Sequence, residues 1–202
     1  MKPKKQDNRE TLLNCALHMF YCKGYDAVSV QEIVDAAGIT KPTLYHYFKS
    51  KRGVLESLLK EKGHVINEKM KCAASVEGSI EKVLKNVIQT QEMMAGELKE
   101  LYLFMLGAYF SPNENAAKQV VAPFIAEQFK MIQDIFGRFF GTIDEAQNEC
   151  CAVGFAGMMH YYISMHIQRK EEQKQLLLSN DEMVDRLIKQ FLYGIQKDII
   201  YS

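Results

Sequence analysis

The 202-residue sequence contains no tryptophan, only four prolines and an odd number of cysteines, five. Cys150 and Cys151 are adjacent and no C-x-x-C pair occurs, so no disulfide framework is expected. Scarce proline, together with the lack of strands that alternate apolar and polar residues, argues against a β-sheet fold. Helical periodicity runs throughout instead, and it predicts an all-α protein of about nine helices in total.

Long apolar runs are also missing. No stretch of 18 apolar residues occurs, so no membrane span is expected. The first ten residues are basic, but no apolar segment follows them as it would in a secretory signal. These two absences predict a cytoplasmic protein with reduced cysteines.

The sequence lacks the groupings that catalysis or metal binding requires. It has no Ser/His/Asp grouping and no glycine-rich phosphate loop. Cys150, Cys151, His160 and His166 fall on one predicted helix, but the cysteines and histidines are more than two turns apart and cannot share an ion. We therefore expect no enzyme, no metal and no cofactor.

Charge is distributed unevenly along a chain whose net charge is zero. Residues 1–62 contain eleven Lys and Arg against seven Asp and Glu, a net charge of +4, so the remainder carries −4. A basic N-terminal part on an acidic remainder orients a protein on a polyanion.

Two short helices joined by a glycine turn are predicted within residues 29–48. Ser29 and Glu32 have the spacing of a capping box, and Gly38 ends the first helix where a positive φ is wanted. Pro42 suits the first turn of the second helix, with either Thr40 or Lys41 as its cap. This is the layout of a helix-turn-helix, whose second helix enters the DNA major groove.

The second of these helices has two different faces. Leu44 and Phe48 point the same way, inward, at about 100° per residue. The remaining side chains can donate to phosphate oxygens, touch a thymine methyl or reach base edges. They are Lys41, Pro42, Thr43, Tyr45, His46 and Tyr47. Lys49, Lys51 and Arg52 follow where another helix begins, and they can neutralise phosphates.

About the first 60 residues resemble the DNA-binding head of the TetR family of bacterial transcriptional regulators. The residues that carry the resemblance are Thr11-Leu12-Leu13 with Ala16, Leu17 and Phe20, Lys23-Gly24-Tyr25, Ser29-Val30 with Ile33, Ala37-Gly38-Ile39-Thr40, and the string LYHYFKSK at 44–51. The resemblance implies a sequence-specific regulator, most often a repressor, that a small-molecule ligand releases from double-stranded DNA. It also implies a homodimer on a near-palindromic operator, which doubles the short site that one helix reads.

The resemblance also assigns roles to individual residues. It implies that Thr40, Lys41, Pro42, Thr43, Tyr45, His46 and Tyr47 face the groove or the DNA backbone. It places Ser29 beside a phosphate, Gln31 beside a base, and Lys51 as a phosphate-binding lysine. Lys41 can read guanine or touch only phosphate, and the sequence leaves both open.

The domain division expected is a helix-turn-helix DNA-binding domain at 1–50 and a helical ligand-binding and dimerisation domain at 51–202. Beyond a first helix at 6–22 and a fourth at 51–73, periodicity and breaks predict further helices. Their ranges are 79–94, 97–109, 113–140, 144–168 and 180–199.

Aromatic and methionine side chains are frequent after residue 100. Such residues at helical spacing are normally buried in a core, and eleven methionines suit an adaptable one. The alternative is that some line a cavity for an apolar or aromatic ligand. The candidates for that cavity are Tyr102, Met105, Tyr109, Phe124, Phe155, Met159, His160 and Tyr162.

The last two helices suggest a four-helix dimer interface, two from each subunit. Small residues on the helix predicted at 144–168 let another helix approach closely, and the helix predicted at 180–199 is too apolar for a free surface. Packing of these two helices within one chain would produce the same sequence pattern. The candidate interface residues are Ala152, Gly154, Ala156, Leu187, Phe191 and Ile195. An alternative function is a helix-turn-helix adaptor controlled by a protein partner, which an exposed apolar patch and a filled core would favour.

Overall fold

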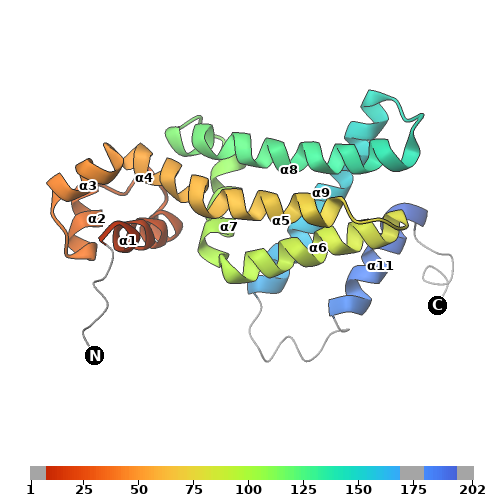
Figure 1. The fold of residues 1–202 in the computed structure, drawn as a ribbon, viewed down its shortest axis with the longest axis horizontal. Helices are drawn as coiled ribbons and strands as arrows, with labels where there is room; N and C mark the ends of the chain where they lie inside the picture. Colours follow the sequence, from red (N-terminus) through yellow and green to blue (C-terminus); the bar gives the residue numbers. More distant parts are fainter. Residues whose placement is uncertain (1–7, 169–179, 195–202) are drawn as a thin grey trace. The chain divides into compact units, whose positions relative to one another are not determined.

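The computed structural model describes residues 8–168 and 180–194, and these residues are helical with no strands (Figure 1). The elements are α1 (Asn8–Lys23), α2 (Val30–Ala37), α3 (Lys41–Phe48), α4 (Lys51–Leu58), a π-helical turn (Leu59–Gly63), α5 (His64–Ala74), α6 (Ile80–Glu97), α7 (Lys99–Tyr109), α8 (Ala116–Phe140), α9 (Glu145–Gln168) and α11 (Asn180–Tyr193). With the unbroken run Lys51–Ala74 counted once, the described residues form nine helices, which confirms the predicted all-α fold.

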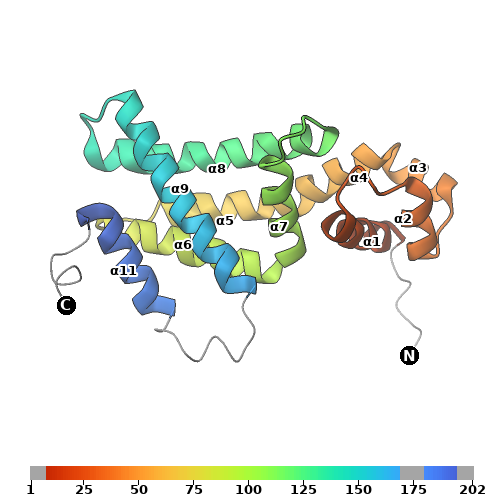
Figure 2. The same cartoon turned by 180° about the vertical axis from the view of Figure 1, so that it is seen from behind.

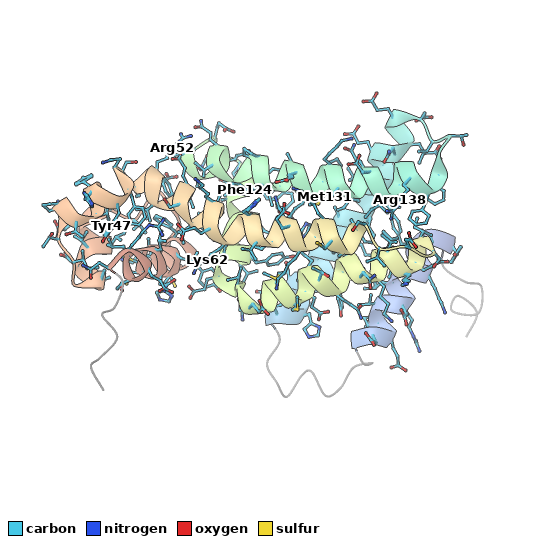
Figure 3. All side chains as sticks on the ribbon, in the orientation of Figure 1. Tyr47, Arg52, Lys62, Phe124, Met131 and Arg138 are labelled. Carbon is cyan, nitrogen blue, oxygen red and sulfur yellow. The ribbon has the colours of Figure 1, made fainter. Side chains whose placement is uncertain are left out.

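Two details of the helices were not predicted. The π-helical turn interrupts the regular pattern between α4 and α5. It ends at the buried Gly63, where a Cβ atom would lie 3.3 Å from two carbons of the Phe124 ring, labelled in Figure 3. The last helix was expected to reach residue 199, but α11 ends at Tyr193, and residues 195–199 lie outside the described residues.

The chain packs as two compact units, Met1–Val65 with Leu98–Ala126 and Ile66–Glu97 with Glu127–Ser202, called the first and second unit below. This is a division by packing. The predicted division into a DNA-binding domain and a ligand-binding domain is functional, and it stays a prediction.

The first unit gathers α1, α2 and α3 around the start of α4 (Figures 1 and 2). Its core takes the apolar faces that helical periodicity indicated, because burying them removes them from water. The buried residues on these helices are Leu12, Leu13, Ala16, Leu17, Phe20, Ile33, Val34, Leu44, Phe48, Val54, Leu55 and Leu58. The predicted stripe of the first helix is confirmed, and α7 also packs on α1.

The second unit is built on aromatic packing. The rings of Phe136 and Phe155 lie 6.1 Å apart, and the Phe191 ring lies 5.9 Å and 5.7 Å from them. Two buried polar side chains of this unit are hydrogen-bonded to each other, since Gln128 Nε2 donates to Asn67 Oδ1 over 2.9 Å. Figures 1 and 2 show α9 and α11 lying against α6 in this unit.

Candidate DNA-binding surface

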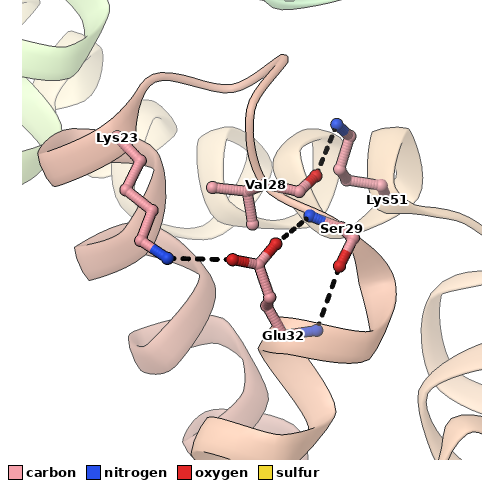
Figure 4. A network of polar contacts seen from close by, with 5 residues as sticks. All are labelled: Lys23, Val28, Ser29, Glu32 and Lys51. Atoms are coloured by element: carbon pink, nitrogen blue, oxygen red, sulfur yellow. Dashed lines mark hydrogen bonds and ion pairs between the residues drawn. The ribbon is translucent and has the colours of Figure 1, made fainter.

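The start of α2 is fixed by a complete capping box. The Ser29 hydroxyl accepts from the Glu32 backbone N–H at 3.2 Å, and the Ser29 N–H donates to Glu32 Oε2 at 2.8 Å (Figure 4). Lys23 Nζ donates to the other carboxylate oxygen at 2.9 Å. The bond from Lys23, followed by those from Ser29, lowers the pKa of Glu32 to about 2. The predicted cap is confirmed, and it is tied to the end of α1.

The turn between α2 and α3 follows from two residues. Gly38 has φ 64° and ψ 31°, the left-handed conformation that a glycine tolerates without steric cost, and this confirms its predicted role. Thr40 is the N-cap of α3, which settles the open choice between Thr40 and Lys41. Its hydroxyl caps no backbone N–H and instead lies 3.0 Å from the hydroxyl of Thr43.

The two predicted faces of α3 are present. Leu44 and Phe48 are buried, at 0% and 4% exposure, while Tyr45 and Tyr47 are 45% and 40% exposed. Lys41, Pro42 and His46 are exposed as well, whereas Thr43 is half-buried. The His46 ring meets the Tyr47 ring edge-on at 5.4 Å. The outer face therefore presents hydroxyl, imidazole and ammonium groups on a rigid helix.

The end of α3 approaches the start of α4 closely. Lys49 leaves α3 with φ 65°, and the Ser50 hydroxyl then accepts from the Gly53 N–H at 3.0 Å. A Cβ atom on Gly53 would lie 1.9 Å from the Phe48 carbonyl oxygen, a distance that backbone atoms cannot accommodate. A glycine at this position lets α3 pack against α4, a requirement that sequence reasoning missed.

Gln31 and Lys51, which the resemblance assigns to DNA, make contacts within the chain. Gln31 is exposed, and its Nε2 donates to Asp35 Oδ1 at 2.6 Å. Lys51 is half-buried, and its Nζ donates to the backbone carbonyls of Tyr25 at 2.8 Å and Val28 at 2.7 Å. The DNA roles of these two residues stay predictions.

Several contacts that sequence reasoning did not predict join α1, the loop after it and α4 to α7, Asn115 and α8 within the first unit. His18 Nδ1 lies 2.7 Å from Glu100 Oε1, and the rings of Phe20 and Phe104 stack at 5.9 Å. Asn115 Nδ2 donates to Asp26 Oδ2 at 2.7 Å. The Arg52 guanidinium, labelled in Figure 3, donates to Gln119 at 3.2 Å. Because these partners lie far apart in the sequence, local patterns carry no signal for them.

Each unit has a surface cleft among the described residues. The first unit has a cleft of about 250 Å³, lined by residues of α1, α7, the start of α8 and the loops after α1 and α7, among them Tyr21, Tyr25 and Phe104. The second has a more open cleft of about 590 Å³ between α5 and α6, with Cys72 and Met93 on its walls. None of the eight predicted pocket residues lines either cleft.

Half of the eight predicted pocket residues are buried, namely Tyr102, Met105, Phe155 and Met159. The other four are half-buried: Tyr109, Phe124, which packs against Gly63, His160 and Tyr162. Burial lowers the pKa of His160 to about 4, so its imidazole is neutral at pH 7. Their role as a ligand pocket stays a prediction.

The predicted dimer residues also differ in their burial within the chain. Ala152 is fully buried within its own chain, and the Phe191 ring lies 3.2 Å from the point where a Gly154 Cβ would be. Ala156, Leu187 and Phe191 are half-buried, and Ile195 lies outside the described residues. The face of α9 that is exposed carries Val153 and Tyr161, at 57% and 72% exposure.

Two further absences apply to residues 8–168 and 180–194. No three His, Cys, Asp or Glu side chains there gather in a way that would hold a metal ion. No helix in these ranges combines the length and apolar character that a membrane crossing requires.

A capped helix pair joined by a left-handed glycine, with an exposed polar and aromatic face on the second helix, defines a helix-turn-helix DNA-binding protein. Residues 12–58 match the family described as bacterial regulatory proteins, tetR family. The chain belongs to the TetR family and is a DNA-binding transcriptional regulator.

Relatives and solved structures agree with this assignment. The chain is 29% identical over 157 residues to the uncharacterized HTH-type transcriptional regulator YdgC of Bacillus subtilis (strain 168), covering 76% of this chain and 80% of YdgC. It is 43% identical over 53 residues to the HTH-type transcriptional repressor KstR2 of Mycolicibacterium smegmatis, 26% of each chain. Its fold is similar to that of FadR from Bacillus subtilis in complex with stearoyl-CoA, at a TM-score of 0.70 and 19% identity, covering 93% and 99% of the two chains.

Proposed function

We propose that this regulator is a repressor, not an enzyme. It binds a near-palindromic operator in double-stranded DNA as a homodimer, and a small apolar or aromatic ligand releases it. The observation that carries the proposal is the exposed outer face of α3, whose helix lies between the left-handed Gly38 and the left-handed Lys49. On this face Tyr45, His46 and Lys41 are free of buried packing and can reach base edges and phosphates.

A homodimer is required because one eight-residue helix reads too few base pairs for useful specificity. We assign the dimer face to the exposed side of α9. Val153, Gly157 and Tyr161 recur every four residues on that side and leave an apolar stripe with a flat centre. The buried Ala152 is not part of this revised face. In the DNA-bound form the two α3 helices should lie about 34–36 Å apart.

The ligand is proposed to bind after residue 50. The name of KstR2 supports repression, and the stearoyl-CoA held by FadR supports a small-molecule ligand with an apolar chain, such as an acyl-CoA. Within the second unit, the side-chain oxygens of Gln91 and Gln128 are buried and accept no hydrogen bond from the described residues. Buried acceptors of this kind suit a ligand that brings a donor.

Operator selection from random duplexes, followed by gel-shift titration at fixed salt, tests the proposal. Tyr45→Ala should weaken binding to the selected duplex about tenfold or more, because it removes a contact on the outer face of α3. Tyr21→Ala, a similarly exposed tyrosine on α1, is the matched control and should leave the affinity unchanged. Stearoyl-CoA and shorter acyl-CoAs should then release the duplex. Failure to select any duplex, or equal effects of both variants, would overturn the proposal.

A further inference from the structure

The peptide group between Val28 and Ser29 is held at both of its polar ends (Figure 4). Its carbonyl accepts from Lys51 Nζ at 2.7 Å, and its N–H donates to Glu32 Oε2 at 2.8 Å. Because a peptide group is planar and stiff, two bonds on opposite edges fix its orientation. This peptide group leads directly into the first turn of α2.

Lys51 is turned toward the protein interior by two further contacts. Its ammonium donates to the Tyr25 carbonyl at 2.8 Å and lies 4.3 Å from the centre of the Tyr25 ring, which adds a cation–π attraction. Two of its three N–H donors are therefore used within the chain. The half-buried ammonium thus holds both ends of the loop from Tyr25 to Val28.

The contacts form one network across three helices. Lys23 at the end of α1 binds Glu32 of α2, Glu32 binds the Ser29 N–H, and Lys51 of α4 binds the adjoining carbonyl. Asp26, inside the same loop, accepts from Asn115. The start of α2 is consequently positioned by groups on α1 and α4 and not by its own helical bonds alone.

The geometry points to Lys51 as a positioning residue for DNA binding. Lys51 fixes the start of α2, and with it Gln31, and does not neutralise a phosphate. This inference rests on the proposed function, since it concerns how the same surface is held for DNA. Lys41 and Lys49 are exposed lysines of this surface, and an exposed ammonium group can reach a phosphate. A hydrogen bond weakens steeply with small errors in distance and angle, so a displaced α2 would lose the contacts of its first turn.

The two roles predict different salt dependence. A lysine that neutralises a phosphate contributes about 0.9 to the slope of log affinity against log salt concentration. We expect Lys51→Met to weaken operator binding about tenfold to a hundredfold, the factor carried by hydrogen bonds to a charged group, with the slope unchanged. Lys49→Met, the matched control two residues earlier, should lower the slope and weaken binding at low salt. A slope reduced by about 0.9 in Lys51→Met would overturn the inference.

A double-mutant cycle with Gln31→Ala tests positioning directly, because a merely structural loss of stability would leave the two effects additive. If Lys51 acts through the start of α2, Gln31→Ala should cost much less affinity in the Lys51→Met background than in the natural chain. Additive effects would overturn the inference.

A second variant tests the same point if Lys51→Met does not fold. Lys51→Gln keeps a donor for the carbonyls but not the charge. It should then bind with an unchanged slope, whereas a phosphate role predicts the reduced one. A natural chain that binds no duplex would refute the proposed function and this assignment with it, whereas a reduced slope or additive effects in a chain that binds DNA would refute the assignment alone.

Discussion

The start of α2 in the first unit and the core of the second unit are stabilised by different kinds of contact. Around α2, the backbone at the helix start is held by hydrogen bonds with the side chains of Glu32 and Lys51, and Lys23 in turn donates to Glu32. In the second unit, aromatic rings of α8, α9 and α11 pack against one another. Hydrogen bonds fix orientation, whereas apolar burial is non-directional and fixes only what is excluded from water. A surface that reads base edges needs the first kind, and a region that adapts to a ligand can use the second.

The largest expected effect removes a ring from the second unit. Phe155→Ala should lower the free energy of unfolding by about 3–5 kcal/mol, because it deletes a fully buried side chain that touches two other rings. Urea denaturation followed by circular dichroism measures the loss. Phe110→Ala, at a position 71% exposed, is the control and should change stability little. Equal losses would show that the aromatic cluster is not what holds the second unit.

A smaller but still large effect is expected where α3 meets α4. Gly53→Ala should cost about 1–3 kcal/mol and weaken operator binding, because its Cβ would force the Phe48 carbonyl aside. Gly96→Ala in α6 meets no atom within 4 Å and should stabilise the protein by about 0.5–1 kcal/mol. Thermal unfolding of the two variants measures this contrast. Similar shifts in melting temperature would remove the evidence for a close approach between α3 and α4.

Acid should weaken the second unit through His160. Burial holds its folded-state pKa near 4, below the ordinary value of 6.5, so the unfolded chain takes up the proton first as pH falls. Stability should therefore be unaffected by this group above about pH 6.5, and it should fall by roughly 1–3 kcal/mol between pH 6.5 and 4. Urea titrations across this range measure the loss, and His160→Phe should remove this part of the pH dependence. An unchanged pH profile in the variant would contradict an imidazole that stays neutral in the folded protein.

The smallest effect concerns the cap of α2. Ser29→Ala should lower stability by about 1 kcal/mol, because the Glu32 N–H loses its acceptor. Ser29→Gly serves as the control and should lower stability by only about a few tenths of a kcal/mol. Because the folded-state pKa of Glu32 is about 2, the carboxylate half of the box should persist well below pH 4.5 and be lost only as pH falls through 2. Amide exchange of residues 29–33 at low pH would reveal any earlier opening.

Much of the fold and of the DNA-reading helix could be predicted because the relevant signals are local. The spacing of Ser29 and Glu32, the glycine at 38 and the alternation of faces around Leu44 each depend on residues within one or two turns. These features were confirmed. Thr43 was placed on the outer face, yet it is half-buried, because its hydroxyl lies against that of Thr40.

The remaining features depend on residues distant in the sequence. Lys51 follows the recognition helix as a phosphate ligand would, but its ammonium reaches back 23 residues to the Val28 carbonyl. Ala152 has the small side chain of an interface residue, but it is fully buried in the core of its own chain. Periodicity defines a helical face without saying which neighbour covers it.

Hydrogen–deuterium exchange of the protein alone and with a selected operator duplex tests the central claim most directly, that the start of α2 and the outer face of α3 bind DNA. We expect slower exchange on binding in residues 29–31 and 40–47, with no comparable change along α9. Protection that spares both of these segments while the duplex is bound would contradict the claim.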